Sequence, residues 1–134
     1  SLKRSINAGL LRREAMYYSY EDLDVWKRSV NVAVGLYRLL DNCREHGIKD
    51  QMLRSAVSIP SNIAEGAERS SQKDFVRFLR ISKGSAAELR TQLHSAGQAN
   101  VVDDEACVRL RTEVTEISRM LQGLIISLGR NGSS

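Results

Sequence analysis

The sequence is poor in residues that interrupt helices and in residues that build sheets. It has one proline, Pro60, and aromatic residues make up only 5% of its 134 residues. β-branched residues do not cluster in alternating runs, so strands are not favoured. No run approaches the roughly 20 apolar residues of a membrane-spanning helix, and the N-terminus has no apolar segment of a secretory signal. These absences favour a helical protein, which we expect to be cytoplasmic and free of the membrane.

Cysteine and histidine are scarce as well. Cys43 and Cys107 lie far apart and outside any C-x-x-C pattern, so two reduced thiols are expected unless the fold brings them together. His46 and His94 do not complete the Glu-x-x-His pairs of di-iron bundles, and two histidines give little support to a zinc site. We interpret His94 as an exposed or satisfied side chain. Phosphate-loop, dinucleotide-binding and serine-hydrolase motifs are missing too, so we expect no metal, no cofactor and no enzymatic activity.

Apolar residues recur at spacings of three and four in four segments, which is the period of one helix face. The first helix is predicted to start near Asp22, an N-cap residue type, and to end before Gly47 as its C′ residue. Its predicted apolar face consists of Leu23, Trp26, Val30, Ala33, Tyr37 and Leu40, with Trp26 as the core anchor.

The second helix is predicted from about Lys49 to Glu65, with Gly66 as its stop. Pro60 falls inside it, so the helix either kinks or divides into two pieces. Its apolar face consists of Met52, Leu53, Ala56, Ile59, Ile63 and Ala64.

The third helix opens at Ser70 or Ser71, where Asp74 completes a variant of the capping box, and Asn100 ends it or its following turn. The small pair Gly84–Ser85 permits close helix approach. The apolar positions of this helix are Phe75, Phe78, Leu79, Ser82, Ala86, Leu89 and Leu93.

The fourth helix opens at the acidic run 103–105, where the helix dipole favours carboxylates. A near-heptad seam follows, made of Ala106, Leu110, Val114, Ile117, Leu121, Leu124 and Leu128. Short loops between four such helices predict one all-α domain, an antiparallel up-down four-helix bundle over residues 21–129. Residues 1–20 are expected to be an arm or an extension added to the native chain, and residues 130–134 a disordered tail.

A resemblance to a known family rests on the segment Gln51 to Leu93. It is carried by the run 58–66 (SIPSNIAEG), then by Lys73-Asp74-Phe75, Arg77-Phe78-Leu79, Gly84-Ser85 and Glu88-Leu89, together with Leu23-Asp24-Val25-Trp26 in the first helix. The sequence resembles the 23S rRNA intervening-sequence proteins. That resemblance implies a bacterial four-helix bundle that assembles as a homopentameric ring and is not an enzyme. It also relates the chain to the accessory variability determinants of diversity-generating retroelements, which bind nucleic acid and a reverse transcriptase.

Basic residues gather on one side of the third helix. They are Lys73, Arg77, Arg80, Lys83 and Arg90, and at 100° per residue they span a sector of roughly 140°, while Asp74 and Glu88 project to another side. The strip could contact successive phosphates, form a solvated face without a partner, or pair with acids of a neighbouring subunit. Because no aromatic residues are interleaved, any binding should read backbone or shape more than sequence.

Polar residues also surround Pro60 in the second helix. Ser58, Ser61, Asn62, Glu65 and Gly66 share this segment with it, and we expect a structural network or a subunit contact there. Proline lacks an N–H and frees a carbonyl near Ala56, which small polar side chains can satisfy. Glu65 has no evident catalytic partner.

Tyrosines cluster just before the first helix, at positions 17, 18 and 20. They could pack on their own bundle or cover a subunit interface.

The net charge of the chain gives little evidence for or against nucleic-acid binding. Lys and Arg exceed Asp and Glu by a formal +4, and most of that excess lies in the arm of residues 1–20. The leading hypothesis is a non-enzymatic oligomer, expected to be a homopentamer, that binds RNA or DNA through the basic strip. The alternative is a scaffold that recruits a partner protein such as a reverse transcriptase.

Overall fold

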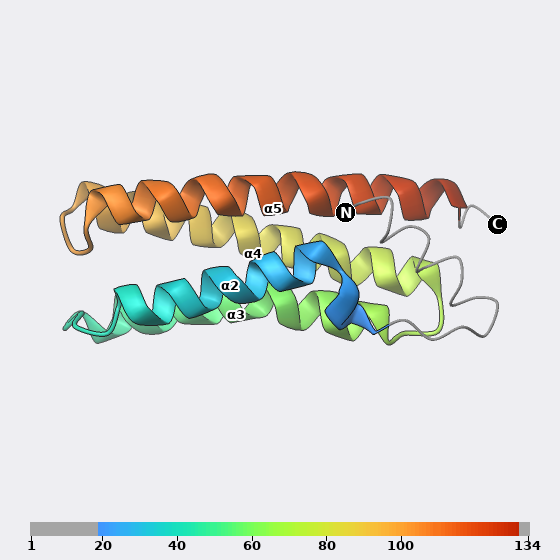
Figure 1. Ribbon diagram of the computed structural model, residues 1–134, viewed down its shortest axis with the longest axis horizontal. Helices are drawn as coiled ribbons and strands as arrows, with labels where there is room; N and C mark the ends of the chain where they lie inside the picture. The colour runs from blue at the N-terminus through green and yellow to red at the C-terminus, as the bar shows by residue number, and fades with distance from the viewer. Residues whose placement is uncertain (1–18, 132–134) are drawn as a thin grey trace.

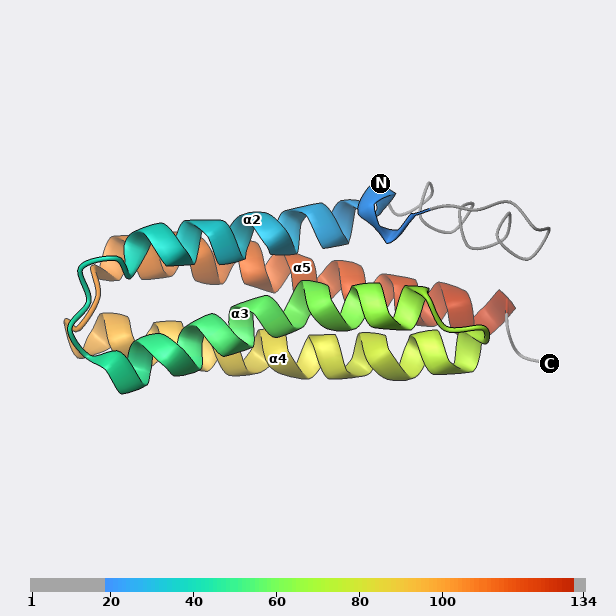
Figure 2. The same cartoon turned by 90° about the horizontal axis from the view of Figure 1, so that it is seen from below.

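The computed structural model describes residues 19–131, which form an antiparallel four-helix bundle. The helices are α2 (Asp24–Leu39), α3 (His46–Ala67), α4 (Gln72–Gln98) and α5 (Asp104–Asn131), and a 3₁₀ turn, η1 (Tyr20–Asp22), precedes them. Each helix packs against its neighbours in the chain, and α2 also packs against α5. The α2–α3 and α4–α5 loops lie at one end of the bundle and the α3–α4 loop at the other (Figures 1 and 2). The all-α, up-down prediction is confirmed.

The core is aliphatic and continuous through the bundle. Its largest fully buried side chains are Leu36, Leu40, Met52, Ile59, Ile63, Leu79, Leu89, Leu93, Val114, Ile117, Leu121 and Leu124. Every apolar position predicted for α4 is buried, and so is the α5 seam from Val114 onward. The 3.6-residue period therefore located these two faces correctly.

The predicted face of α2 is partly wrong. Tyr37 is 54% exposed and Trp26 is only half-buried, so neither anchors the core. The buried face instead carries Val32 and Leu36 beside residues predicted correctly. Tyr20 packs edge to face on Trp26, with ring centroids 5.4 Å apart, so this tyrosine covers its own bundle. Tyr17 and Tyr18 lie outside the described residues.

Several predicted helix ends differ from the structure. The N-cap of α2 is Leu23, without a side-chain cap, and Asp22 belongs to η1. Gly47 lies in the first turn of α3 rather than after α2, and α5 continues through Gly129 to Asn131. Residues 1–18 and 132–134 lie outside the description.

Other predicted ends are confirmed. The side chain of Ser71 accepts the N–H of Asp74 as the N-cap of α4. Asp103 accepts the N–H of Ala106 at the start of α5. Asn100 adopts a φ of 58° after α4, and bonds from Val101 to Ala96 and from Asn100 to Gly97 close a Schellman motif.

Helix α3 passes through Pro60 without dividing, and it continues through Gly66. Gly66 is buried against α4: a Cβ there would lie 2.6 Å from Phe78 Cβ and 3.0 Å from Phe75 Cδ1. It therefore serves close packing and does not stop the helix. Gly84, predicted to permit close approach, has open space around it instead.

Candidate functional site

The predicted basic residues lie along α4 and differ in exposure. Lys73, Arg77 and Arg80 are exposed, whereas Lys83 and Arg90 are half-buried. We call these five residues the α4 basic strip. From Lys73 to Arg90 the strip extends about 25 Å at 1.5 Å per residue.

Arg77 contacts two neighbouring side chains of α4. Its Nε lies 3.7 Å from Asp74 Oδ1, so the prediction that Asp74 points away from the strip is wrong. The Arg77 guanidinium also stacks 4.5 Å from the centroid of the Phe78 ring. Arg69, which the sequence analysis did not include, lies 4.9 Å from the same ring and pairs with Glu65 at 2.9 Å. Cation–π contacts thus hold two guanidinium groups at this end of α4.

The remaining carboxylate of α4 is turned toward α3. Glu88 accepts a hydrogen bond from Ser55 at 3.2 Å, which agrees with its predicted direction. Within residues 19–131, Lys73 and Arg80 are not within ion-pair distance of any carboxylate. Among residues 19–131, the exposed face of α4 is therefore basic and almost unneutralised.

Helix α5 meets the C-terminal half of the strip with neutral and basic groups. Lys83 Nζ donates to Gln122 Oε1 at 2.6 Å, which ties the strip to α5 and engages one lysine proton. Near the C-terminal end of α4, Arg111 of α5 lies 2.9 Å from His94 Nδ1. Arg111 was not among the predicted binding residues, because its position beside Arg90 depends on how α4 and α5 are aligned. The prediction that His94 is exposed or satisfied is confirmed.

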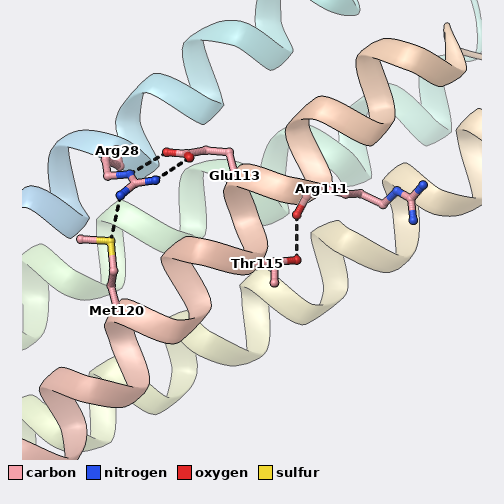
Figure 3. A network of polar contacts seen from close by, with 5 residues as sticks. All are labelled: Arg28, Arg111, Glu113, Thr115 and Met120. Atoms are coloured by element: carbon pink, nitrogen blue, oxygen red, sulfur yellow. Dashed lines mark hydrogen bonds and ion pairs between the residues drawn. The ribbon is translucent and has the colours of Figure 1, made fainter.

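A second cluster joins α5 to α2 on the opposite side. Arg28 donates from Nε to Glu113 Oε2 at 2.8 Å and from Nη2 to Glu113 Oε1 at 2.6 Å, and Nη1 contacts Met120 Sδ at 3.5 Å. Figure 3 shows Glu113 and Arg111 extending from α5 in opposite directions, Glu113 toward Arg28. Hydrogen bonding to Arg28 lowers the pKa of Glu113, and the same bond raises the pKa of Arg28. Glu113 neutralises Arg28, whereas Arg111 has no ion-pair partner among residues 19–131.

The lowered pKa of Glu113 predicts a stability contribution that depends on pH. It is fully present above the carboxylate's unfolded pKa, near 4.3, and is lost as the pH falls through the lower folded value. Both side chains are more than one-third exposed, so solvent limits the coupling to at most about 1 kcal/mol. A double-mutant cycle with Arg28→Gln and Glu113→Gln, measured by urea unfolding, should show coupling at pH 7 and almost none at pH 2. Equal coupling at both pH values would contradict the assignment.

Two of the polar residues around Pro60, Ser58 and Asn62, form a network that joins α3 to α4. Ser58 Oγ lies 2.8 Å from Ser85 Oγ, and Asn62 donates to the Ser58 carbonyl at 2.8 Å. The buried Ser82 hydroxyl donates to the Ile59 carbonyl at 2.9 Å. Carbonyls beside the proline thus receive extra donors, which supports an unbroken helix. Ser61 and Glu65, in contrast, are exposed and face away from this network.

The remaining reactive side chains do not build a catalytic cluster in the described part of the chain. Cys43 and Cys107 are free thiols, and burial raises the pKa of Cys107. Among residues 19–131, no three His, Cys, Asp or Glu side chains gather closely enough to hold a metal ion. No helix in that range is long and apolar enough to cross a membrane.

Comparison with known proteins identifies the family of this chain. The family model described as "23S rRNA-intervening sequence protein" matches residues 21–123. The chain belongs to this family. A solved structure from Bacteroides thetaiotaomicron, a protein of unknown function of the S23 ribosomal protein family, is similar with a TM-score of 0.71 and 27% identity, covering 76% of this chain and 95% of that chain. A search of curated proteins finds no match.

The part of the chain shared with the 23S rRNA-intervening sequence proteins contains every group described above. The α4 basic strip, His94, Arg111 and the Arg28–Glu113 pair all lie within residues 21–123. The α4 basic strip is therefore part of the family domain and does not belong to an added segment.

Proposed function

We propose that this 23S rRNA-intervening sequence protein binds the backbone of RNA or DNA through the α4 basic strip, without catalysing a reaction. The observation that carries the proposal is the charge along the α4 basic strip. Lys73 and Arg80 are exposed and have no ion-pair partner among residues 19–131, and the two carboxylates of α4 are engaged by Arg77 and Ser55. About 25 Å of such a surface matches roughly seven phosphates of one strand at 3.4 Å each.

The surroundings of Phe78 favour backbone contact over base recognition. Phe78 is the aromatic residue closest to the strip, and it is only 7% exposed beneath two guanidinium groups. A base cannot stack on a ring that is covered in this way. The strip is therefore expected to bind phosphates with little sequence preference.

We also propose that the protein functions as a homo-oligomer, in which several copies bring their strips together. Support comes from large apolar side chains left exposed on all four helices: Val34, Tyr37, Val57, Ile81, Val108 and Ile126. A closed ring needs two different complementary surfaces on each subunit, and these residues supply apolar area on more than one side. Native mass spectrometry at micromolar concentration should give a multiple of the 15.0 kDa chain, and a stable monomer would exclude this assembly.

A salt titration tests the proposed function. The affinity for a labelled structured RNA or DNA duplex should fall with a log–log slope of about −3 to −5, since up to five strip cations displace counterions. Between 50 and 200 mM salt, the loss should be roughly 100-fold. If neither ligand binds at about 50 mM salt, nucleic-acid binding is excluded.

A further inference from the structure

A hollow of about 400 Å³ lies between α4 and α5, at the end of the α4 basic strip. It is lined by Ala87, Arg90, Thr91, His94, Arg111 and Thr115. Two guanidinium groups and an imidazole thus share one small cavity, and no carboxylate of residues 19–131 lines it. Like charges brought together without a counter-charge are unfavourable unless an anion or solvent compensates them.

The hydrogen bonds inside the hollow show which donors remain free. Thr91 and Thr115 donate their hydroxyl protons to backbone carbonyls of their own helices, at 3.0 and 2.8 Å. They shape the wall but do not offer those protons to a ligand. Arg111 Nη1 lies 2.9 Å from His94 Nδ1. Because a guanidinium has only donors, this contact requires a neutral imidazole that accepts at Nδ1 and carries its proton on Nε2.

Arg111 supplies a second observation. Its Nε is shielded from solvent and has no hydrogen-bond partner within the described structure. A buried donor without a partner is costly. When the side chain turns to present its Nε–Nη2 edge to the hollow, the guanidinium can bind an oxyanion through two parallel N–H···O bonds. Arg90, which is half-buried and has no ion-pair partner among residues 19–131, faces the same cavity.

We propose that this hollow is a binding site for one phosphate group, held by Arg90 and Arg111 with His94 orienting the Arg111 guanidinium. The identity of the phosphate rests on the proposed function: because Arg90 belongs to both the strip and the hollow, a strand bound along the strip delivers a backbone phosphate to it. Arginine suits this role because its planar guanidinium can donate two parallel hydrogen bonds to two oxygens of one phosphate. The hollow thus fixes the position of the nucleic acid, which the open strip alone does not.

The first experiment tests the site without nucleic acid. Inorganic phosphate is titrated into the full chain, and the arginine Nε–H resonances are followed by NMR. Saturable shifts are expected for Arg111 and Arg90, with none for Arg28, whose Nε is bonded to Glu113. Shifts of equal size at all arginines would overturn a specific site.

The second experiment compares Arg111→Gln with Arg109→Gln, an exposed arginine on the opposite face of α5. Arg111→Gln should weaken RNA binding about fivefold to tenfold and reduce the salt slope by about one, whereas Arg109→Gln should change affinity less than twofold. Arg111→Lys keeps the charge but cannot donate two parallel hydrogen bonds, so its affinity should lie between those of Arg111→Gln and the wild type. If Arg111→Gln binds RNA like the wild type, the hollow is not the site, although the strip can still bind. If phosphate saturates the site but RNA does not bind, the site stands and the proposed function fails.

Discussion

Reversing the charge at Lys73 and Arg80 together is expected to lower nucleic-acid affinity by roughly 100-fold and to reduce the salt slope by about two. These two members of the α4 basic strip are exposed and have no carboxylate partner in residues 19–131. A cation that no longer meets a phosphate releases no counterion, and each glutamate introduced adds repulsion. Lys73→Glu/Arg80→Glu should retain its fold, since a glutamate in the first turn of α4 suits the helix dipole. Fluorescence anisotropy at several salt concentrations gives both quantities.

A matched control changes the net charge equally at another place. Arg38 on α2 and Arg44 in the following loop are both exposed and lie outside α4 and α5. Arg38→Glu/Arg44→Glu should weaken binding less than about threefold, because only long-range attraction is reduced and salt screens it. Equal decreases in affinity for the two double variants would mean that net charge, and not the strip, governs binding.

The α4 basic strip shows which features of a helical bundle can be predicted from the sequence. Residues on one helix share a face at fixed angles, so the direction of all five cations followed from their spacing along α4. The side chains that these cations contact could not be predicted from that spacing. The approach of Asp74 to Arg77, and the stacking of Arg77 and Arg69 on Phe78, depend on rotamers and on the α3–α4 loop.

The hollow between α4 and α5 could not be predicted from the sequence. Arg90 and Arg111 are 21 positions apart, and their meeting requires the register of two antiparallel helices as well as the face of each. The heptad seam fixes which side of α5 is buried, but it does not fix which turn of α4 lies opposite Arg111. His94 was interpreted correctly as satisfied, yet its partner could be found only in the structure.

Errors at α2 and at the glycines arose because local patterns do not determine which residues are packed. In α2, spacings of three and four fit two overlapping faces, and the large rings of Trp26 and Tyr37 favoured the wrong one. Gly47 and Gly66 have the residue type of helix ends, but both lie inside α3. Local propensity is weak beside tertiary packing, which requires a small residue within α3 at Gly66. No packing requires glycine at Gly47, where a Cβ would meet nothing within 4 Å.

The second large effect is expected from Gly66→Ala. This substitution should decrease the free energy of unfolding by about 1–2 kcal/mol. A Cβ at this position would lie 2.6 Å from Phe78 Cβ and 3.2 Å from the Phe75 carbonyl oxygen. Neither atom is the free end of a flexible side chain, so α3 and α4 must separate. Overpacking of this kind costs roughly 1–3 kcal/mol, and the higher helix propensity of alanine returns up to about 1 kcal/mol. Thermal unfolding should show a melting temperature lower by about 4–8 °C.

Gly84→Ala is the matched control, since Gly84 lies within α4 and a Cβ there meets nothing within 4 Å. Only the propensity gain applies, so this variant should be more stable by about 0.5–1 kcal/mol. The same substitution thus acts in opposite directions at two helical glycines. Because Phe78 supports the Arg77 guanidinium, displacing α4 at Gly66 should also weaken nucleic-acid binding by a few-fold at a temperature where the variant is folded. If Gly66→Ala stabilised the protein as Gly84→Ala does, close approach of α3 and α4 at this turn would be disproved.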